Sequence, residues 1–228
     1  MCLSSFFRSQ FASPSGLFGS LFVAPFLNIT SMGLIRASID LLEPKPDDRV
    51  LDIGFGGGYS LLALAERVPN GQVVGVDHSR DMVEAAANLI RGEQLQSRIR
   101  VRRGNVAKLP FAASTFDRVL TVNTIYYWPD VRAGLGEIAR VLKPGGRLVV
   151  GFRSPGSLRL VTLTWNDFRR CEPQEVSEAM RKAGFRLLRV AHPSLWRMPD
   201  NVVLIGDYKK RSARRPVRKA IAVAKPLK

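Results

Sequence analysis

A short apolar run that leads directly into closely spaced glycines, at residues 49–60, constrains the fold more than any other segment. Its first half is typical of a β-strand, and residues 61–68 have the pattern of a helix. Glycine permits a sharp turn and a close approach to a ligand, because no Cβ stands in the way. The helix that follows directs free N–H groups and a partial positive charge toward that ligand. This unit predicts one half of a nucleoside-binding site.

The second half of the site is predicted at residues 72–77, a strand-like run that ends in Asp77. A carboxylate at the end of the second strand, about twenty residues after the glycine loop, can accept hydrogen bonds from a ribose diol. His78 follows it directly. We therefore expect Asp77 and His78 to contact the nucleoside.

The glycine spacing distinguishes two classes of nucleoside ligand. A dinucleotide-binding loop has the pattern G-x-G-x-x-G, and its third glycine packs the helix against the strand. That position is Tyr59 here, which disfavours an NAD-type oxidoreductase and leaves it as an alternative. The glycines are instead Gly54, Gly56 and Gly58, preceded by Asp52. This pattern resembles motif I of the class I S-adenosylmethionine-dependent methyltransferases.

The resemblance continues along the chain in the order of the family's motifs. Residues 104–111 look like the stretch after the third strand, where an acidic residue usually binds the adenine amino group. This chain has Asn105 there, and its amide oxygen can still accept a hydrogen bond. Residues 114–123 resemble the fourth strand, and residues 138–150 resemble the helix, Pro-Gly-Gly turn and fifth strand. These motifs are most similar to the branch that includes the ubiquinone and menaquinone biosynthesis methyltransferases.

The resemblance implies S-adenosylmethionine as the cofactor and methyl transfer to a small molecule as the reaction. It also implies that Asp52 helps to order the ammonium group of the cofactor, directly or through water, and that the methionine half lies beyond Asn123. The cofactor-binding residues implied in this way are Asp52, Gly54, Gly56, Gly58, Asp77, His78, Asn105, Val106 and Asn123.

The acceptor pocket is predicted next to the end of the fourth strand. Methyl transfer is an in-line displacement, so alignment and exclusion of water matter most, and a base is needed only if the acceptor holds its proton tightly. The sequence identifies no catalytic residue. Three aromatic residues at 126–128 can shape an apolar pocket, although two of them are expected to be packing residues. By resemblance, the N-terminal region and a loop or helical insertion that begins at 151–154 also cover this pocket. The candidates are Asn28, Tyr126, Tyr127, Trp128 and Arg153.

The predicted fold is α/β, a Rossmann-like, doubly wound sheet. A helix over residues 175–183 ends before Gly184, a residue suited to the position after a helix, and strands follow at 185–192 and 201–208. By resemblance, the sheet has seven mostly parallel strands in the order 3-2-1-4-5-7-6, with an antiparallel last strand. The chain divides into an N-terminal helical lid region at 1–45, the methyltransferase domain at 46–208 and a tail at 209–228.

The tail carries more than half of the net positive charge of the chain. The formal net charge is +16, and residues 209–228 hold nine Lys or Arg and no acidic residue, which leaves +7 for the rest. Such a run is usually solvated and disordered, and we expect this of the tail. The alternative is an arm that binds RNA or an anionic membrane surface, in which case a macromolecule would be the substrate or partner.

The composition excludes several other classes. No run of about 20 apolar residues is present, so no membrane-spanning helix is expected. The cysteines Cys2 and Cys171 form no C-x-x-C motif, which favours a cytoplasmic location, and His78 and His192 are too few for a histidine-rich metal site. We therefore expect no metal. The acceptor atom and the oligomeric state do not follow from the sequence.

Overall fold

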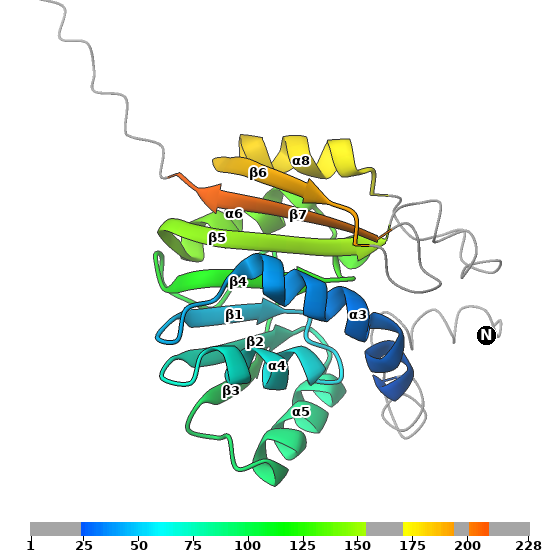
Figure 1. Cartoon of the computed structure of the whole chain (residues 1–228), viewed down its shortest axis with the longest axis vertical. Coiled ribbons are helices and arrows are strands. Elements are labelled where there is room, and N and C mark those ends of the chain that lie inside the picture. Colours follow the sequence, from blue (N-terminus) through cyan, green and yellow to red (C-terminus); the bar gives the residue numbers. More distant parts are fainter. Residues whose placement is uncertain (1–23, 154–170, 194–200, 210–228) are drawn as a thin grey trace, which may run out of the picture.

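The computed structural model of the chain describes residues 24–153, 171–193 and 201–209 (Figure 1). Within these residues, seven strands form one sheet in the order β3-β2-β1-β4-β5-β7-β6. Neighbouring strands are parallel, except that β7 is antiparallel to both β5 and β6. The predicted fold class, strand order and antiparallel last strand are confirmed. The strands are β1 (Arg49–Ile53), β2 (Gln72–Asp77), β3 (Ile99–Arg103), β4 (Phe116–Val122), β5 (Leu142–Arg153), β6 (Phe185–Ala191) and β7 (Asn201–Tyr208).

Apolar side chains alternate between the two faces of the sheet and build two separate cores. In β5, Leu148 and Val150 belong to the core on one face, and Val149 belongs to the core on the other. Helices α6 and α8 cover the first core, and α3, α4 and α5 cover the second. Figure 1 shows α3 and α4 across the near face of the sheet. The helices are α3 (Ala24–Leu42), α4 (Tyr59–Arg67), α5 (Arg80–Gly92), α6 (Val131–Val141) and α8 (Pro173–Lys182), with a short 3-10 helix η2 (Ile125–Tyr127).

The helix ends follow from local side-chain chemistry. The carboxylate of Asp130 accepts the backbone N–H groups of Arg132 and Ala133 at 2.7 and 3.3 Å, which caps the start of α6. α4 and α8 both begin slightly earlier than predicted, α8 with Pro173 in its first turn. Gly184 follows α8 with a φ of +100°, as expected for the residue after a helix.

The end of β5 differs from the sequence prediction. The sequence predicted a loop or a helical insertion from residue 151, whereas β5 continues to Arg153. This prediction was wrong because Gly151, Phe152 and Arg153 pair with β7, a strand far away in the sequence. Local pattern cannot reveal such a pairing. Residue 154 and the insertion predicted after it lie outside the described residues.

Helix α3 packs against β4, β5 and α4. It approaches the sheet closely at Gly151, where a Cβ would lie 2.6 Å from Oγ of Ser38. Arg36 donates a hydrogen bond to the hydroxyl of Tyr59, and its guanidinium lies 5.7 Å from the centre of that ring. Tyr59, at the position where a dinucleotide-binding loop has glycine, thus contacts α3. The division into a lid region at 1–45 and a domain at 46–208 stays a prediction.

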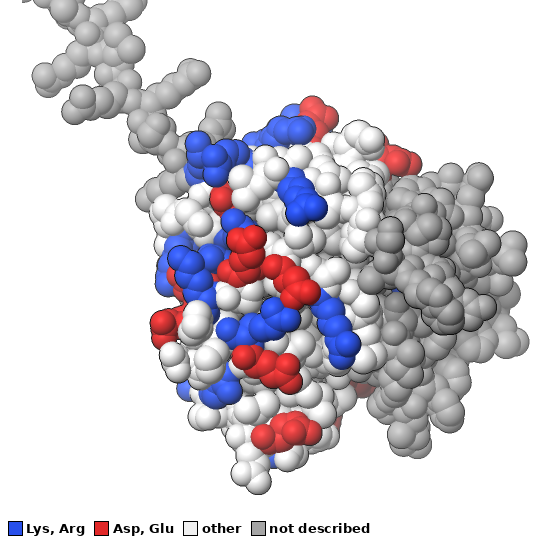
Figure 2. Space-filling model, in the orientation of Figure 1, with Lys and Arg blue, Asp and Glu red and all other residues white. Residues whose placement is uncertain are grey.

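Ion pairs gather at the amino ends of the strands, opposite the glycine loop. Asp117 accepts hydrogen bonds from Nζ of Lys143 at 2.8 Å and from the backbone N–H of Arg49 at 3.0 Å. Arg147 and Asp207 pair at 3.0 Å. On the face that Figure 2 shows, Lys and Arg lie interspersed with Asp and Glu. This end of the sheet is therefore held by paired charges.

Candidate functional site

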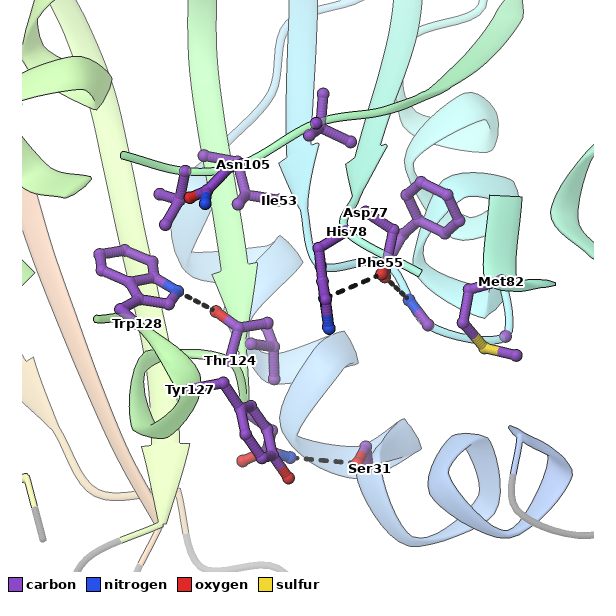
Figure 3. A pocket seen from close by; sticks show the side chains of 18 of the residues that line it. Ser31, Ile53, Phe55, Asp77, His78, Met82, Asn105, Thr124, Tyr127 and Trp128 are labelled. Atoms are coloured by element: carbon purple, nitrogen blue, oxygen red, sulfur yellow. Dashed lines mark hydrogen bonds and ion pairs between the residues drawn. The ribbon is translucent and has the colours of Figure 1, made fainter. Parts of the chain in front are cut away.

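A cavity of about 270 Å³ lies at the carboxyl ends of β1, β2, β3 and β4 (Figure 3). Ser31 and Ile35 of α3 line its other side. The chain order reverses between β1 and β4, and in open α/β sheets ligands bind at such a reversal. The structure thus gathers most of the residues that the sequence predicted into one cavity.

The three glycines of the loop have different surroundings. Gly54 has a φ of +74°, and a Cβ on it would lie 2.3 Å from Cγ2 of Thr124. Gly56 has a φ of +54° and lines the cavity, with no atom within 4 Å of the place where a Cβ would be. Gly58 does not line the cavity, and a Cβ there would lie 3.2 Å from Leu89 of α5. Gly56 is therefore the position at which a side chain would enter the ligand space.

Asp77 connects β2 to the glycine loop. Its Oδ2 accepts the backbone N–H of Gly56 at 3.1 Å, and its Oδ1 accepts that of Ser79 at 2.9 Å. Nδ1 of His78 lies 3.5 Å from Oδ1. Both Asp77 and His78 line the cavity, and Asp77 is buried. A carboxylate has about four lone-pair sites, so Asp77 can accept further hydrogen bonds from a ligand.

Asp52 lies below the loop and does not line the cavity. Its side chain is buried, and within the described part of the chain its Oδ2 has no hydrogen-bond partner. Burial raises the pKa of Asp52 to about 7; a hydrogen bond with Ser60 opposes this shift, and the neighbouring Asp77 carboxylate adds to it. The role of Asp52 in ordering an ammonium group stays a prediction. Because Asp52 is buried and does not line the cavity, such a contact with the ligand would be indirect.

The segment after β3 brings Asn105 and Val106 to the cavity. Oδ1 of Asn105 accepts the backbone N–H of Ala107 at 2.9 Å, which holds the turn. The amide oxygen keeps a second lone pair and the amide nitrogen two donors, so Asn105 can bond a ligand in either sense. The side chain of Val106 is buried and also faces the cavity.

Asn123 sits at the end of β4 in an unusual backbone conformation. Its φ is +56°, in the left-handed region that asparagine adopts more readily than most residues other than glycine. The backbone N–H of Asn123 donates to the carbonyl of Gly151 at 2.8 Å, and its Nδ2 donates to Oγ of Ser31 at 3.0 Å. Asn123 therefore links the sheet to α3 at the wall of the cavity.

The three aromatic residues after β4 divide between lining and packing. Tyr127 and Trp128 line the cavity, and Nε1 of Trp128 donates to Oγ1 of Thr124 at 3.2 Å. Tyr126 is buried away from the cavity, and its hydroxyl donates to the carbonyl of Arg153 at 3.1 Å. Burial raises the pKa of Tyr127 to about 12 and that of Tyr126 further, so both hydroxyls stay protonated. Two of the three aromatics were predicted to be packing residues. Tyr126 and Trp128 fit this prediction because both are buried in the core, although Trp128 also lines the cavity.

Neither of the other two acceptor-pocket candidates, Arg153 and Asn28, is seen to line the cavity. Arg153 is partly buried at the end of β5 and does not line the cavity. Asn28 lies in α3, and its side chain is outside the described residues. Their predicted contact with the acceptor stays a prediction.

Sequence reasoning missed several residues that line the cavity. A signal was present for Phe55, because Gly75 interrupts the apolar strand β2 and a glycine inside a strand marks a close approach. A Cβ on Gly75 would lie 2.6 Å from Cδ1 of Phe55. The others come from α3, from α5 and from the turn after β4, where one sequence gives no sign of the packing. The missed residues include Ser31, Ile35, Phe55, Met82 and Thr124.

Among residues 24–153, 171–193 and 201–209, no group of three or more His, Cys, Asp or Glu residues has a geometry that could hold a metal ion. No described helix is both long enough and apolar enough to span a membrane.

Comparison with known proteins agrees with this site. Residues 50–146 match a family described as a methyltransferase domain. A demethylmenaquinone methyltransferase from Lactobacillus johnsonii is 34% identical over 145 residues, which cover 63% of this chain and 59% of the relative. The chain spans between 32% and 60% of the length of the curated relatives that it matches.

Solved structures show the same fold at low identity. Geranyl diphosphate methyltransferase in complex with S-adenosylmethionine has a TM-score of 0.68 at 17% identity, over 88% of this chain and 94% of that one. The [4+2]-cyclase SpnF has a TM-score of 0.67 at 20% identity, over 77% and 80% of the two chains. The shared fold therefore occurs in proteins named for different reactions.

The chain is thus an α/β domain with a cavity at the carboxyl ends of its central strands, and residues 50–146 of it are similar to a methyltransferase domain. Relatives that match part of the chain at 34–38% identity are named demethylmenaquinone methyltransferase.

Proposed function

We propose that this chain transfers a methyl group from S-adenosylmethionine to a small, apolar aromatic acceptor. The observation that carries the proposal is the single cavity in which Gly56, Asp77 and Asn105 meet Tyr127 and Trp128 (Figure 3). The first three residues are suited to a nucleoside and the last two to an apolar molecule. Both halves of a methyl-transfer reaction would thus lie side by side.

The residues present fit the cofactor. Gly56 leaves open space where any other residue would place a Cβ, and Asp77 keeps acceptor capacity for ribose hydroxyls. Asn105 and Val106 would contact the adenine, and Asn123 would lie beside the methionine half. When bound, S-adenosylmethionine supplies an activated methyl group. The task of the protein is then to align the acceptor and to exclude water.

The acceptor side of the cavity is apolar and has little acid–base capacity. Ile35, Tyr127 and Trp128 line it. Because burial raises the pKa of Tyr127 to about 12, its hydroxyl can donate a hydrogen bond but does not take up a proton near neutral pH. These residues suit an acceptor that reacts without a strong base. The name of the Lactobacillus johnsonii relative supports a quinone-type aromatic ring.

Calorimetric titration tests this function. S-adenosylhomocysteine, the product form of the cofactor, is expected to bind, whereas NAD is not, because Tyr59 holds α3 where a dinucleotide loop needs glycine. Binding of NAD with no binding of S-adenosylhomocysteine would contradict the proposal. Mass spectrometry of the purified protein would then identify any co-purified acceptor.

A macromolecular substrate is not favoured. Residues 210–228 of the basic tail at 209–228 lie outside the described residues, and the charged face in Figure 2 is mixed in sign. We also propose that residues 1–45 act as a helical lid, which is supported by the position of Ser31 and Ile35 in the cavity wall. A cytoplasmic location is a further part of the proposal.

A further inference from the structure

The segment 104–111, between β3 and β4, carries Asn105 and Val106 to the cavity and is bonded to the end of β2 only at its start, where the N–H of Gly104 donates to the carbonyl of Asp77 at 2.9 Å. Its backbone makes one isolated bridge, between Asn105 and Lys108, outside the strand ladders. The turn is closed by the Asn105 side chain and by the N–H of Lys108, which donates to the carbonyl of Asn105 at 3.0 Å. These are bonds within the segment. They do not fix its position relative to the rest of the domain.

Two side chains of α6 hold the other half of the segment, which also receives a hydrogen bond from Arg102 of β3 to the carbonyl of Pro110 at 3.2 Å. Oε2 of Glu137 accepts the backbone N–H of Leu109 at 2.8 Å. The guanidinium of Arg140 donates to the carbonyl of Leu109 at 3.0 Å and to that of Phe111 at 2.7 Å. Leu109 itself is buried, so its backbone groups need partners. Side chains of α6 thus supply the hydrogen bonds that a neighbouring strand would supply in a sheet.

Glu137 and Arg140 also hold each other. Nε of Arg140 donates to Oε1 of Glu137 at 2.7 Å, and Nη2 donates to Oε2 at 2.8 Å, a bidentate pair. The hydrogen bond from Arg140 lowers the pKa of Glu137 despite partial burial, helped by the Leu109 N–H. Both groups therefore stay charged near neutral pH. The planar guanidinium fixes the direction of its remaining donors, which reach the two carbonyls.

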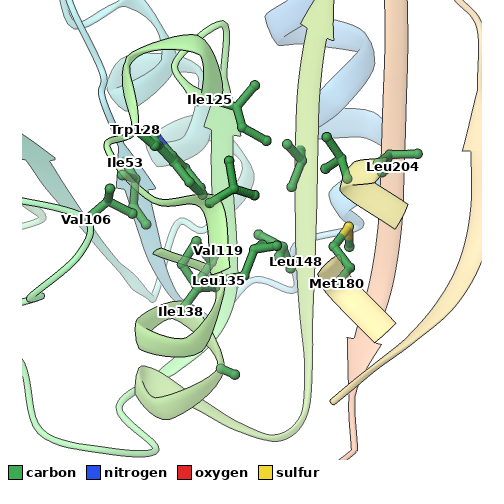
Figure 4. Packing of buried hydrophobic residues seen from close by; sticks show 14 of the residues in the cluster. Ile53, Val106, Val119, Ile125, Trp128, Leu135, Ile138, Leu148, Met180 and Leu204 are labelled. Atoms are coloured by element: carbon green, nitrogen blue, oxygen red, sulfur yellow. The ribbon is translucent and has the colours of Figure 1, made fainter. Parts of the chain in front are cut away.

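The same helix reaches the cavity through its packing face. A Cβ on Gly134 would lie 2.7 Å from Cε3 of Trp128 and 3.3 Å from Cγ2 of Val106. Figure 4 shows Val106 and Trp128 beside Leu135 and Ile138 of α6. Helix α6 therefore contacts the segment both at its polar end, near Leu109, and at the residue that faces the cavity.

We propose that Glu137 and Arg140 are positioning residues that hold segment 104–111 so that Asn105 and Val106 face the adenine of the cofactor. This inference rests on the proposed function, because it assigns the adenine to that end of the cavity. Neither residue lines the cavity, so neither touches the ligand. Their effect on affinity acts through the segment.

Matched substitutions test the proposal by titration with S-adenosylhomocysteine. Glu137→Ala and Arg140→Ala are expected to raise the dissociation constant at least about tenfold. Glu137→Gln keeps an oxygen that accepts the Leu109 N–H and is expected to stay within about threefold of wild type. Arg140→Lys is expected to remain impaired, because an ammonium cannot bond a carboxylate and two carbonyls in the same planar arrangement.

The control is Lys143→Ala, which removes the ion pair with Asp117 at the amino ends of β4 and β5, the end of the sheet away from the cavity. It is expected to lower the thermal midpoint without changing the affinity. Amide exchange provides a second readout, since Glu137→Ala should speed exchange at Leu109. If Glu137→Ala and Arg140→Ala bind with wild-type affinity although they lower the midpoint, the two residues are merely structural and the proposal fails. If the wild-type protein itself does not bind S-adenosylhomocysteine, the proposed function fails first.

Discussion

The carboxylate of Asp77 accepts the backbone N–H of Gly56 at 3.1 Å, so the residue that ends β2 holds the loop that follows β1. This hydrogen bond gives Asp77 two tasks. It shapes the loop before any ligand binds, and it keeps lone pairs directed at the cavity that it lines. Sequence spacing suggested only the second task.

The two tasks of Asp77 predict different effects for two substitutions. Asp77→Ala removes both, and the loss of charge-assisted hydrogen bonds should weaken S-adenosylhomocysteine binding by at least about 1.4 kcal/mol, or tenfold. Asp77→Asn keeps an oxygen for Gly56 and should lose less. Calorimetric titration measures both. Unchanged affinity in Asp77→Ala would remove this residue from the site.

Gly56→Val should abolish cofactor binding while the domain stays folded. The position faces open cavity space, so the new side chain would occupy the ligand volume, although the φ of +54° also adds some strain. Circular dichroism checks the fold, and titration with S-adenosylhomocysteine checks the binding. An affinity equal to that of wild type would contradict the assignment of the loop.

Gly136 provides a matched control on the exposed side of α6. It also has open space around its Cβ position, but its φ is not positive and it does not line the cavity. Gly136→Ala should raise the free energy of unfolding by about 0.5–1 kcal/mol, because alanine is the better helix former. The affinity for S-adenosylhomocysteine should not change.

The sequence predicted those parts of the site that depend on a motif read along one segment. The glycine loop, Asp77, Asn105 and Asn123 all lie where the spacing placed them, because parallel strands bring their carboxyl ends to one edge of the sheet. Gly58 was also assigned to the cofactor, but it packs against α5. The motif does not distinguish a glycine that makes room for a ligand from one that makes room for a helix.

The parts that sequence reasoning missed depend on packing between distant segments. Ser31 reaches the cavity because α3 crosses β4 and β5, and no local pattern encodes that crossing. The extension of β5 to Arg153 depends on pairing with Asn201, which follows it only much later in the chain. The hydrogen bonds that Glu137 and Arg140 make with the backbone of Leu109 likewise join segments distant in the sequence, so no local pattern predicts them.

The buried carboxyl group of Asp52 predicts a falling stability with rising pH. Burial raises its pKa from 3.8 to about 7, so between about pH 4 and pH 7 the folded state holds a proton that the unfolded state has lost. The free energy of unfolding should fall across this window by up to about 1.4 kcal/mol per pH unit. Asp52→Asn should flatten this slope in urea unfolding curves. An identical slope in the variant would mean that Asp52 is ionised in the folded protein throughout.

Asp117 predicts the opposite dependence at lower pH. Partial burial would raise its pKa, but hydrogen bonds from Lys143 and from the backbone N–H of Arg49 hold it below its ordinary value of 3.8. A depressed pKa contributes stability that is present above about pH 4 and is lost as the pH falls through the folded-state value. Asp117→Asn should cost about 0.5–1 kcal/mol near neutral pH, since the pair is partly exposed, and the cost should shrink below about pH 4. Unfolding at pH 3 and pH 7 separates this effect from that of Asp52, because the two groups titrate on opposite sides of pH 4. A cost that is the same at both pH values would show that the Lys143 ion pair contributes nothing to folding.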